Sequence, residues 1–190
     1  NEEPTHRVGA RYLTAASGMS AREVKDNLSK AKALYEPVMK NIKIKEAGGR
    51  DMAWVESVCK AYKPDILVLD MGDKFGITGS FARPDEALKA CAIYARQIAK
   101  TYDCAVFYMS QLSAEAEGRQ RLNQSMMEGS RTGKAAEADL MILIGKTNAE
   151  IEGEEEDSPL RHLNIVKNKL NGWHGMVNVN LNYLTARYEG

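Results

Sequence analysis

The chain has 190 residues, of which 44% are hydrophobic, so it can bury one sizeable core and a single domain is expected. Its 26 basic and 26 acidic residues balance, which excludes a protein that coats polyanions over its whole surface but leaves room for a local basic patch. No apolar run approaches the roughly 20 residues of a membrane span. The cysteines are far apart and stand in apolar contexts, which favours buried thiols in a cytoplasmic protein (Cys59, Cys91, Cys104).

The first third of the chain predicts helices and one short strand. Helices are expected over three stretches, each with its own boundary signal: 5–17, which Gly18 ends; about 21–33, which begins with the capping box of Ser20 and Glu23; and 51–62, after two glycines. Pro37 should break or kink the chain after the second helix. Residues 41–46 alternate between apolar and polar types, which predicts a strand with one solvated face.

The most informative stretch is Ile66-Leu-Val-Leu69-Asp70, an apolar run that follows Pro64 and ends in an acid. Such a run predicts a strand buried on both faces, and ligands of parallel α/β sheets bind beyond the carboxyl ends of the strands. Four apolar residues followed by Asp form the Walker B pattern, whose carboxylate holds Mg²⁺ through water. An acid at a strand end can also cap the next helix, so this alternative stays open.

Strands and helices continue to alternate in the rest of the chain. We expect a loop over 72–83, a helix over 84–102, buried strands at 104–109 and 139–144, a polar stretch over 113–134 and a hairpin of strands 163–167 and 176–183. This order predicts an α/β fold with a mostly parallel sheet, flanking helices and a C-terminal antiparallel hairpin. Residues 1–190 are expected to form one domain.

Four further residues near expected strand ends suit nucleotide chemistry. Glu2 could act as a general base, although a solvated terminal acid is the simpler interpretation. Gln111 could hydrogen-bond a γ-phosphate, or merely cap its strand. Lys167 and Lys169 project from the same strand face and could reach the nucleotide of a neighbouring subunit, or remain in solvent on an edge strand.

Basic residues in two polar stretches suit contacts with a nucleic-acid backbone. The stretch 112–134 contains no aromatic residue, which favours phosphate contact over base stacking, and Lys74 could add a similar contact from the loop before it. Acidic residues in the same stretch weaken this prediction, and a plain solvated loop is the alternative. The candidates for DNA contact are Lys74, Arg119, Arg121, Arg131 and Lys134.

A phosphate-binding loop is not recognisable in the sequence. The nearest candidate is Gly129–Lys134, but it has three residues between its glycines instead of four, and Ala135 stands where Ser or Thr would contact Mg²⁺. The chain also begins at Asn1 with charged residues instead of Met. We therefore expect an N-terminally truncated domain whose phosphate cradle lies upstream.

Taken together, these motifs resemble the RecA-like motor domain of DnaB-family and phage replicative DNA helicases over nearly all 190 residues. Glu2 resembles the catalytic glutamate of that family, with Arg11 nine residues later where an arginine recurs. Leu67–Asp70 resembles Walker B, Ser110-Gln111-Leu112 the sensor motif, and the stretch from Gly129 to Asp139 the second DNA-binding loop. Residues 165–175 resemble the stretch that completes the neighbour's active site, with Lys169 where an arginine finger is usual.

The resemblance implies an ATP-dependent DNA helicase that hydrolyses ATP between subunits and translocates on single-stranded DNA. It implies ATP and Mg²⁺ as cofactors, a hexameric ring, primase as a further partner, no membrane, and the cytoplasm of a bacterium or of a phage-infected host. Asp70 would order the Mg²⁺ shell and Glu2 would activate water. The fragment alone should be inactive. A RecA-like recombinase, a circadian-clock-type ATPase and a non-catalytic α/β interaction module are the alternatives.

Overall fold

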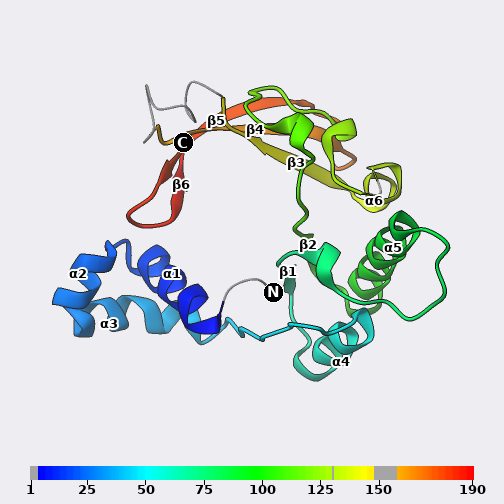
Figure 1. The fold of residues 1–190 in the computed structure, drawn as a ribbon. Coiled ribbons are helices and arrows are strands. Elements are labelled where there is room, and N and C mark those ends of the chain that lie inside the picture. The colour runs from blue at the N-terminus through cyan, green and yellow to red at the C-terminus, as the bar shows by residue number, and fades with distance from the viewer. Residues whose placement is uncertain (1–3, 130, 148–157) are drawn as a thin grey trace.

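A computed structural model describes residues 4–129, 131–147 and 158–190 of the chain (Figure 1). Its helices are α1 (Thr5–Ser17), α2 (Ala21–Asp26), α3 (Leu28–Met39), α4 (Met52–Tyr62), α5 (Pro84–Tyr102) and α6 (Arg131–Glu137). Its strands are β1 (Ile66–Leu69), β2 (Ala105–Tyr108), β3 (Leu140–Gly145), β4 (Leu160–Asn168), β5 (Gly175–Asn182) and β6 (Arg187–Glu189). Short 3-10 helices span Gly72–Lys74 (η1), Ala114–Ala116 (η2) and Gln124–Met126 (η3).

The described strands form two separate sheets. β1 and β2 pair in parallel, with Ile66 opposite Ala105 and Leu69 opposite Tyr108. The other sheet is antiparallel and has the order β3-β4-β5-β6. The α/β class, the flanking helices and the C-terminal hairpin are therefore confirmed, but the parallel part is smaller than the prediction of a mostly parallel sheet. β3 is apolar throughout but buried on one face only, since Leu140, Ile142 and Ile144 are exposed, and such an apolar run does not specify the orientation of its partner.

The first hydrophobic core lies between the parallel pair and the helices α4 and α5. Its fully buried side chains include Met52 and Cys59 of α4, Cys91 and Ile98 of α5, and Leu69 of β1. These helical residues recur at spacings of three, four or seven, which is the pattern of one helix face. The core holds β1 and β2 from one side and so fixes where their carboxyl ends lie.

The second hydrophobic core lies under the antiparallel sheet. It combines Met141 and Leu143 of β3 with Ala135 of α6 and with Leu122 and Met126 from the stretch after β2. Much of the stretch 112–134, predicted as a polar loop, is thus anchored by apolar side chains. Asn164 of β4 adds polar anchors, because its amide nitrogen donates to the Gln120 carbonyl at 3.0 Å and its oxygen accepts from the Leu122 N–H at 3.2 Å.

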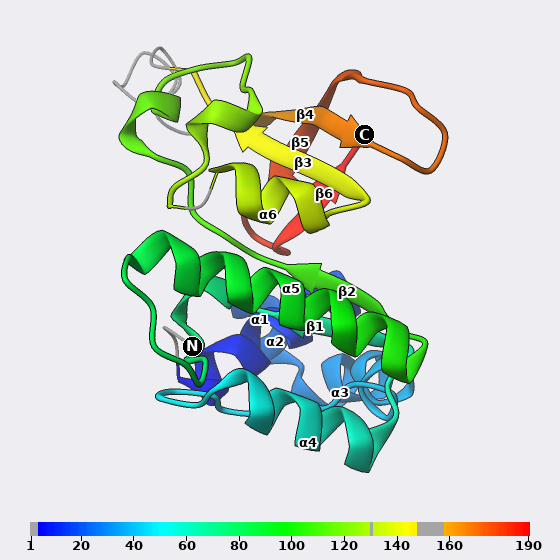
Figure 2. The same cartoon turned by 90° about the vertical axis from the view of Figure 1, so that its right-hand side faces the viewer.

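Two views show how these cores are arranged. In Figure 2 the antiparallel sheet lies above the helices and the parallel pair, and α6 lies between that sheet and α5. The chain crosses from one part to the other after β2 (Figure 1). A second connection is made by Arg187 of β6, whose guanidinium donates to the Ala15 carbonyl at 2.6 Å and to the Ala16 carbonyl at 3.3 Å near the end of α1.

Several local predictions are confirmed and two are wrong. α1 ends at Gly18, which has φ 68°, and the Ser20–Glu23 capping box is present. The second predicted helix breaks at Asn27, whose side chain accepts from the Lys30 N–H and so begins α3. Pro37 lies within α3, and that helix ends two residues later, at Met39. Residues 41–46 form no strand, since no described strand pairs with them.

The three cysteines should not react with a thiol reagent in the folded protein. They are buried, and burial raises the pKa of Cys59 and of Cys91 to about 11 and raises the pKa of Cys104. Relative to the ordinary value of 9.0, a pKa near 11 lowers the thiolate fraction at pH 8 about 100-fold. Titration with an aromatic disulfide at pH 8 should give no fast reaction natively and three thiols after denaturation; fast native labelling would contradict this burial.

Candidate functional site

The carboxyl ends of β1 and β2 lie at the same edge and are held closely together. The Met109 N–H donates to the Leu69 carbonyl at 3.1 Å, and the Gly72 N–H donates to the Met109 carbonyl at 2.8 Å. The Tyr108 ring packs on Gly72, where a Cβ atom would lie 2.6 Å from the ring. This position therefore requires glycine, and it fixes the turn that follows Asp70.

Asp70 lies at this edge with its carboxylate available to a ligand. Its side chain is exposed and, within the described residues, accepts no hydrogen bond and forms no ion pair. Met71 follows with φ 56°, a left-handed conformation that turns the chain sharply away from the strand. Gln111, three residues beyond β2, is also exposed. The structure therefore brings the ends that carry Asp70 and Gln111 to one edge, as the sequence predicts.

A pocket of about 410 Å³ opens beside Asp70. Its walls come from α1, from the turn after β1 and from the β5–β6 turn, and its lining includes Val8, Arg11, Tyr12, Ala15, Asp70, Met71 and Ala186. The volume is within the range of small-molecule sites. A guanidinium and a carboxylate in one pocket can bind a phosphate and the cation that accompanies it.

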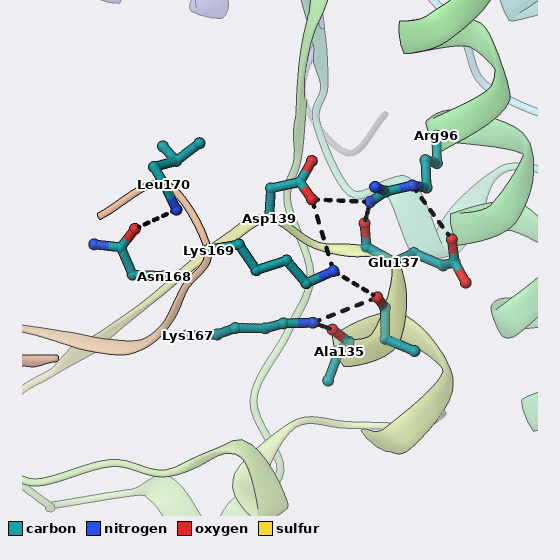
Figure 3. Close-up of polar contacts among 9 residues, drawn as sticks. Arg96, Ala135, Glu137, Asp139, Lys167, Asn168, Lys169 and Leu170 are labelled. Carbon is teal, nitrogen blue, oxygen red and sulfur yellow. Dashed lines mark hydrogen bonds and ion pairs between the residues drawn. The ribbon is translucent and has the colours of Figure 1, made fainter. Parts of the chain in front are cut away.

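Lys167 and Lys169 do not line this pocket. Both project from the end of β4 toward the C-terminal carbonyls of α6 (Figure 3). Lys167 donates to the Ala135 carbonyl and, at 3.4 Å, to that of Ala136; Lys169 donates to Ala136 at 3.5 Å and lies 3.7 Å from the Asp139 carboxylate. Cations are favoured at the C-terminus of a helix, where unpaired carbonyls gather.

The electrostatics of Lys167 differ from those of an ordinary surface lysine. Partial burial lowers the pKa of the Lys167 ammonium, and the adjacent Lys169 charge lowers that pKa further. Arg96 of α5 approaches from the other side, with its guanidinium donating to the Glu137 carbonyl and to the Asp139 carboxylate, the latter at 3.1 Å (Figure 3). The end of α6 is thus surrounded by three cations.

The residues predicted to contact DNA fall into different environments. Lys74, Arg119 and Arg121 are exposed. Lys134 is not, since only 4% of it is accessible and its ammonium lies 2.8 Å from the Asp73 carboxylate. Its assignment to DNA is therefore corrected, because a buried and paired ammonium cannot contact a phosphate backbone. Glu2 and the Arg131 side chain lie outside the described residues.

Two parts of the site have no sequence signal. Asp73 and Tyr108 belong to the buried cluster around Lys134, and the contact between Asp73 and Lys134 spans 61 positions. The pocket wall formed by Ala186 comes from the far end of the chain. Arg11 could be singled out only through the resemblance to helicases, and the pocket adds a physical reason to include it.

The described residues contain neither a membrane-crossing helix nor a cluster of metal-binding side chains. None of the helices there is both long and apolar enough to cross a bilayer. No group of three or more His, Cys, Asp or Glu side chains in the described ranges could hold a metal ion. Asp70 offers one carboxylate to a cation at this site, and Mg²⁺ usually keeps several waters and binds through one or two carboxylates.

Comparisons with known proteins give a match in structure but not in sequence. No family model matches the chain, and neither does any curated protein. A solved DnaB-like replicative helicase, described with its interactions with primase, has a TM-score of 0.84 at 18% identity over 99% of this chain. A solved ATPase domain has a TM-score of 0.85 at 18% identity over 100% of this chain and 72% of its own.

The alignment covers only part of the DnaB-like helicase. The chain spans about half the length of that helicase, namely 49%. Identity of 18% carries the fold alone, and TM-scores of 0.84 and 0.85 make that assignment firm. The chain therefore has the RecA-like fold of helicase ATPase domains.

Proposed function

We propose that this chain is the ATPase motor of a DnaB-type replicative DNA helicase, hydrolysing ATP at subunit interfaces to translocate on single-stranded DNA. The observation that carries the proposal is the exposed Asp70 carboxylate at the carboxyl end of β1, which has no partner among the described residues and lines a pocket that also contains Arg11. Parallel α/β folds bind ligands at this edge, and the fold itself is that of helicase ATPase domains.

The residues present suit Mg²⁺ and ATP. Asp70 offers a hard oxygen donor with room for water around it, which fits Mg²⁺. When bound, the ion would neutralise charge on the phosphates. Glu2 is assigned to water activation, Gln111 to sensing the γ-phosphate, and Arg11 to binding phosphate in the pocket. We assign the phosphate cradle to a segment outside these 190 residues, because no phosphate-binding loop is recognisable within them.

Stabilisation of transition-state charge on a neighbouring subunit's nucleotide is assigned to Lys167 and Lys169. To reach a neighbour's nucleotide, the Lys167 ammonium must leave the Ala135 and Ala136 carbonyls, and the Lys169 ammonium must leave the Ala136 carbonyl and the Asp139 carboxylate. A phosphate oxygen can replace the carbonyls, because its charge-assisted hydrogen bond is stronger than a bond to a neutral carbonyl. This role needs an assembly in which one subunit lies against the next, and a hexameric ring is proposed.

Lys74, Arg119, Arg121 and Arg131 are the remaining candidates for contact with the DNA backbone. Arg119, Arg121 and Arg131 belong to the stretch that begins directly after Gln111. Loss of a γ-phosphate contact at Gln111 would therefore affect the DNA-contacting stretch directly. Primase is proposed as a partner, since the DnaB-like helicase of the same fold interacts with one. The proposed compartment is the cytoplasm of a bacterium or of a phage-infected host.

The test is ATP turnover by the native protein at its full length, with and without single-stranded DNA. Turnover that DNA stimulates at least about fivefold would support a motor. Particle mass should show a closed ring; a filament on DNA would favour a recombinase instead. Absence of turnover together with absence of nucleotide binding would reject the proposal and favour an interaction module.

A further inference from the structure

A buried ionic cluster joins three segments that are far apart in the sequence. The Lys134 ammonium lies 2.8 Å from Oδ2 of Asp73 and donates to Oγ of Ser110 at 2.8 Å. The Ser110 hydroxyl donates to the same Oδ2, and the Tyr108 hydroxyl donates to Oδ1 at 3.0 Å. The side chains of Lys134 and Asp73 are only 3% and 17% exposed. Each oxygen of the Asp73 carboxylate is thus hydrogen-bonded.

Tyr108 strengthens the cluster as a neutral donor. Burial raises the pKa of its hydroxyl, and the charge of Asp73 raises that pKa further, so the hydroxyl keeps its proton. The ring also packs on Gly72. Tyr108 therefore links the end of β2 to the turn after β1 through both packing and a hydrogen bond.

Stability alone is a poor explanation for this arrangement. Burying a lysine and a carboxylate costs several kcal/mol per ion, and apolar residues of similar size often give an equally stable fold. A buried ion pair does, however, favour one arrangement over alternatives, because displacing one partner leaves the other charge unpaired. The cluster therefore suits a function that depends on where its segments lie.

The positions of Asp73, Ser110 and Lys134 in the chain show which segments the cluster connects. Asp73 follows Asp70 by three residues, and Ser110 directly precedes Gln111. Lys134 belongs to α6, at the far end of the stretch that begins after Gln111. The cluster thus attaches both ends of the proposed DNA-contacting stretch to the edge that carries the proposed nucleotide residues. Residues 112–134 cannot move far at either end without affecting that edge.

We propose that Lys134 is a positioning residue that couples DNA contact in 112–134 to ATP turnover at the edge formed by β1 and β2. Its ammonium, held by Asp73 and Ser110, fixes Gln111 relative to Asp70 and transmits displacement of α6 to both. The proposal rests on the proposed function and replaces the earlier assignment of Lys134 to the DNA surface. It makes Asp73 and Ser110 the acceptors through which the coupling acts.

The experiment uses the full-length protein and removes the ion pair without leaving a buried charge. Lys134→Met alone strands the Asp73 carboxylate and can unfold the domain, so the main variant is the double substitution Asp73→Asn with Lys134→Met. We expect its stimulation by single-stranded DNA to fall about tenfold, a typical allosteric coupling, while the KM for ATP changes less than about twofold. Hydrogen exchange of the amides of 110–134 should become faster.

Arg96→Met is the matched control. Arg96 also ties α6 to the rest of the domain, through Glu137 and Asp139, but it does not touch Asp73 or Ser110. It should keep the wild-type ratio of DNA-stimulated to basal turnover. Equal loss of that ratio in both variants would mean that any loosening of α6 suffices, and it would overturn the specific role of Lys134.

The outcomes separate this proposal from the proposed function. A double variant that melts earlier but keeps the wild-type stimulation ratio would make the cluster merely structural and overturn the coupling. A wild-type protein without ATP turnover or nucleotide binding would reject the motor, and the coupling with it. In that case hydrogen exchange still shows whether the cluster holds 110–134, because this readout requires no activity.

Discussion

Replacing Asp70 with Asn is expected to lower ATP turnover about 100-fold or more. The cation would lose its protein carboxylate, and with it several kcal/mol of transition-state stabilisation. The fold should be unaffected. Asp70 is exposed and has no partner among the described residues, so the free energy of unfolding should change by no more than about 0.5 kcal/mol. Steady-state turnover over a Mg²⁺ titration, together with thermal unfolding, measures both effects.

Asp65→Asn is the matched control for that experiment. Asp65 precedes β1, at the opposite end of the strand from Asp70, and it is also exposed. The same change of charge is made there, away from the proposed site. Turnover should stay at the wild-type level. Normal turnover by Asp70→Asn would remove Asp70 from the site, and equal loss in both variants would indicate a general effect of charge.

Local signals explain which parts of the fold could be predicted from the sequence. The Ser20–Glu23 capping box, the glycine after α1 and the apolar run before Asp70 each fix structure within a few residues, and each element is found where expected. β1 is not buried on both faces as predicted, however, because Ile66 and Val68 are exposed. The boundary between α2 and α3 also has a local signal, because Asn27 is a favoured N-cap residue. The helical pattern on both sides of Asn27 obscured that signal. The strand predicted at 41–46 failed because a strand needs a partner, which its own sequence does not specify.

In the candidate site, too, some features follow from sequence patterns and others depend on tertiary contacts. The edge that brings Asp70 and Gln111 together follows from strand order, which the alternation of elements indicates. The projection of Lys167 and Lys169 to one side follows from the two-residue period of a strand, and both reach the Ala136 carbonyl. Lys134 resembled its basic neighbours in sequence, and only a contact 61 positions away shows that it is buried. Tertiary pairing of this kind leaves no local pattern.

Replacing Lys167 and Lys169 together with Met is expected to lower ATP turnover about 1,000-fold if they act as trans cations, the lower end of the effect of an arginine finger. Binding of ATP should change much less, since such cations act mainly on the transition state. A modest loss of stability is also expected, because the carbonyls of α6 lose their caps. Turnover, nucleotide affinity and thermal unfolding are measured on one preparation.

Lys100→Met controls for the loss of a lysine from a helix end. Lys100 is exposed in the last turn of α5, and its replacement removes one of the two positive charges that the double variant loses, without touching the capping contacts of Lys167 and Lys169. Turnover by this variant should equal that of the wild type.

Mixing subunits decides whether the two lysines act across an interface. Protomers with Asp70→Asn keep their lysines, and protomers with the double Met substitution keep Asp70, so each kind is inactive by itself. In a mixed ring, an intact Asp70 can lie against a neighbour's intact lysines, and partial turnover should return. Failure of the mixture to recover, in rings shown to contain both kinds of protomer, would place the action of the lysines within their own subunit. Their role would then be to hold α6.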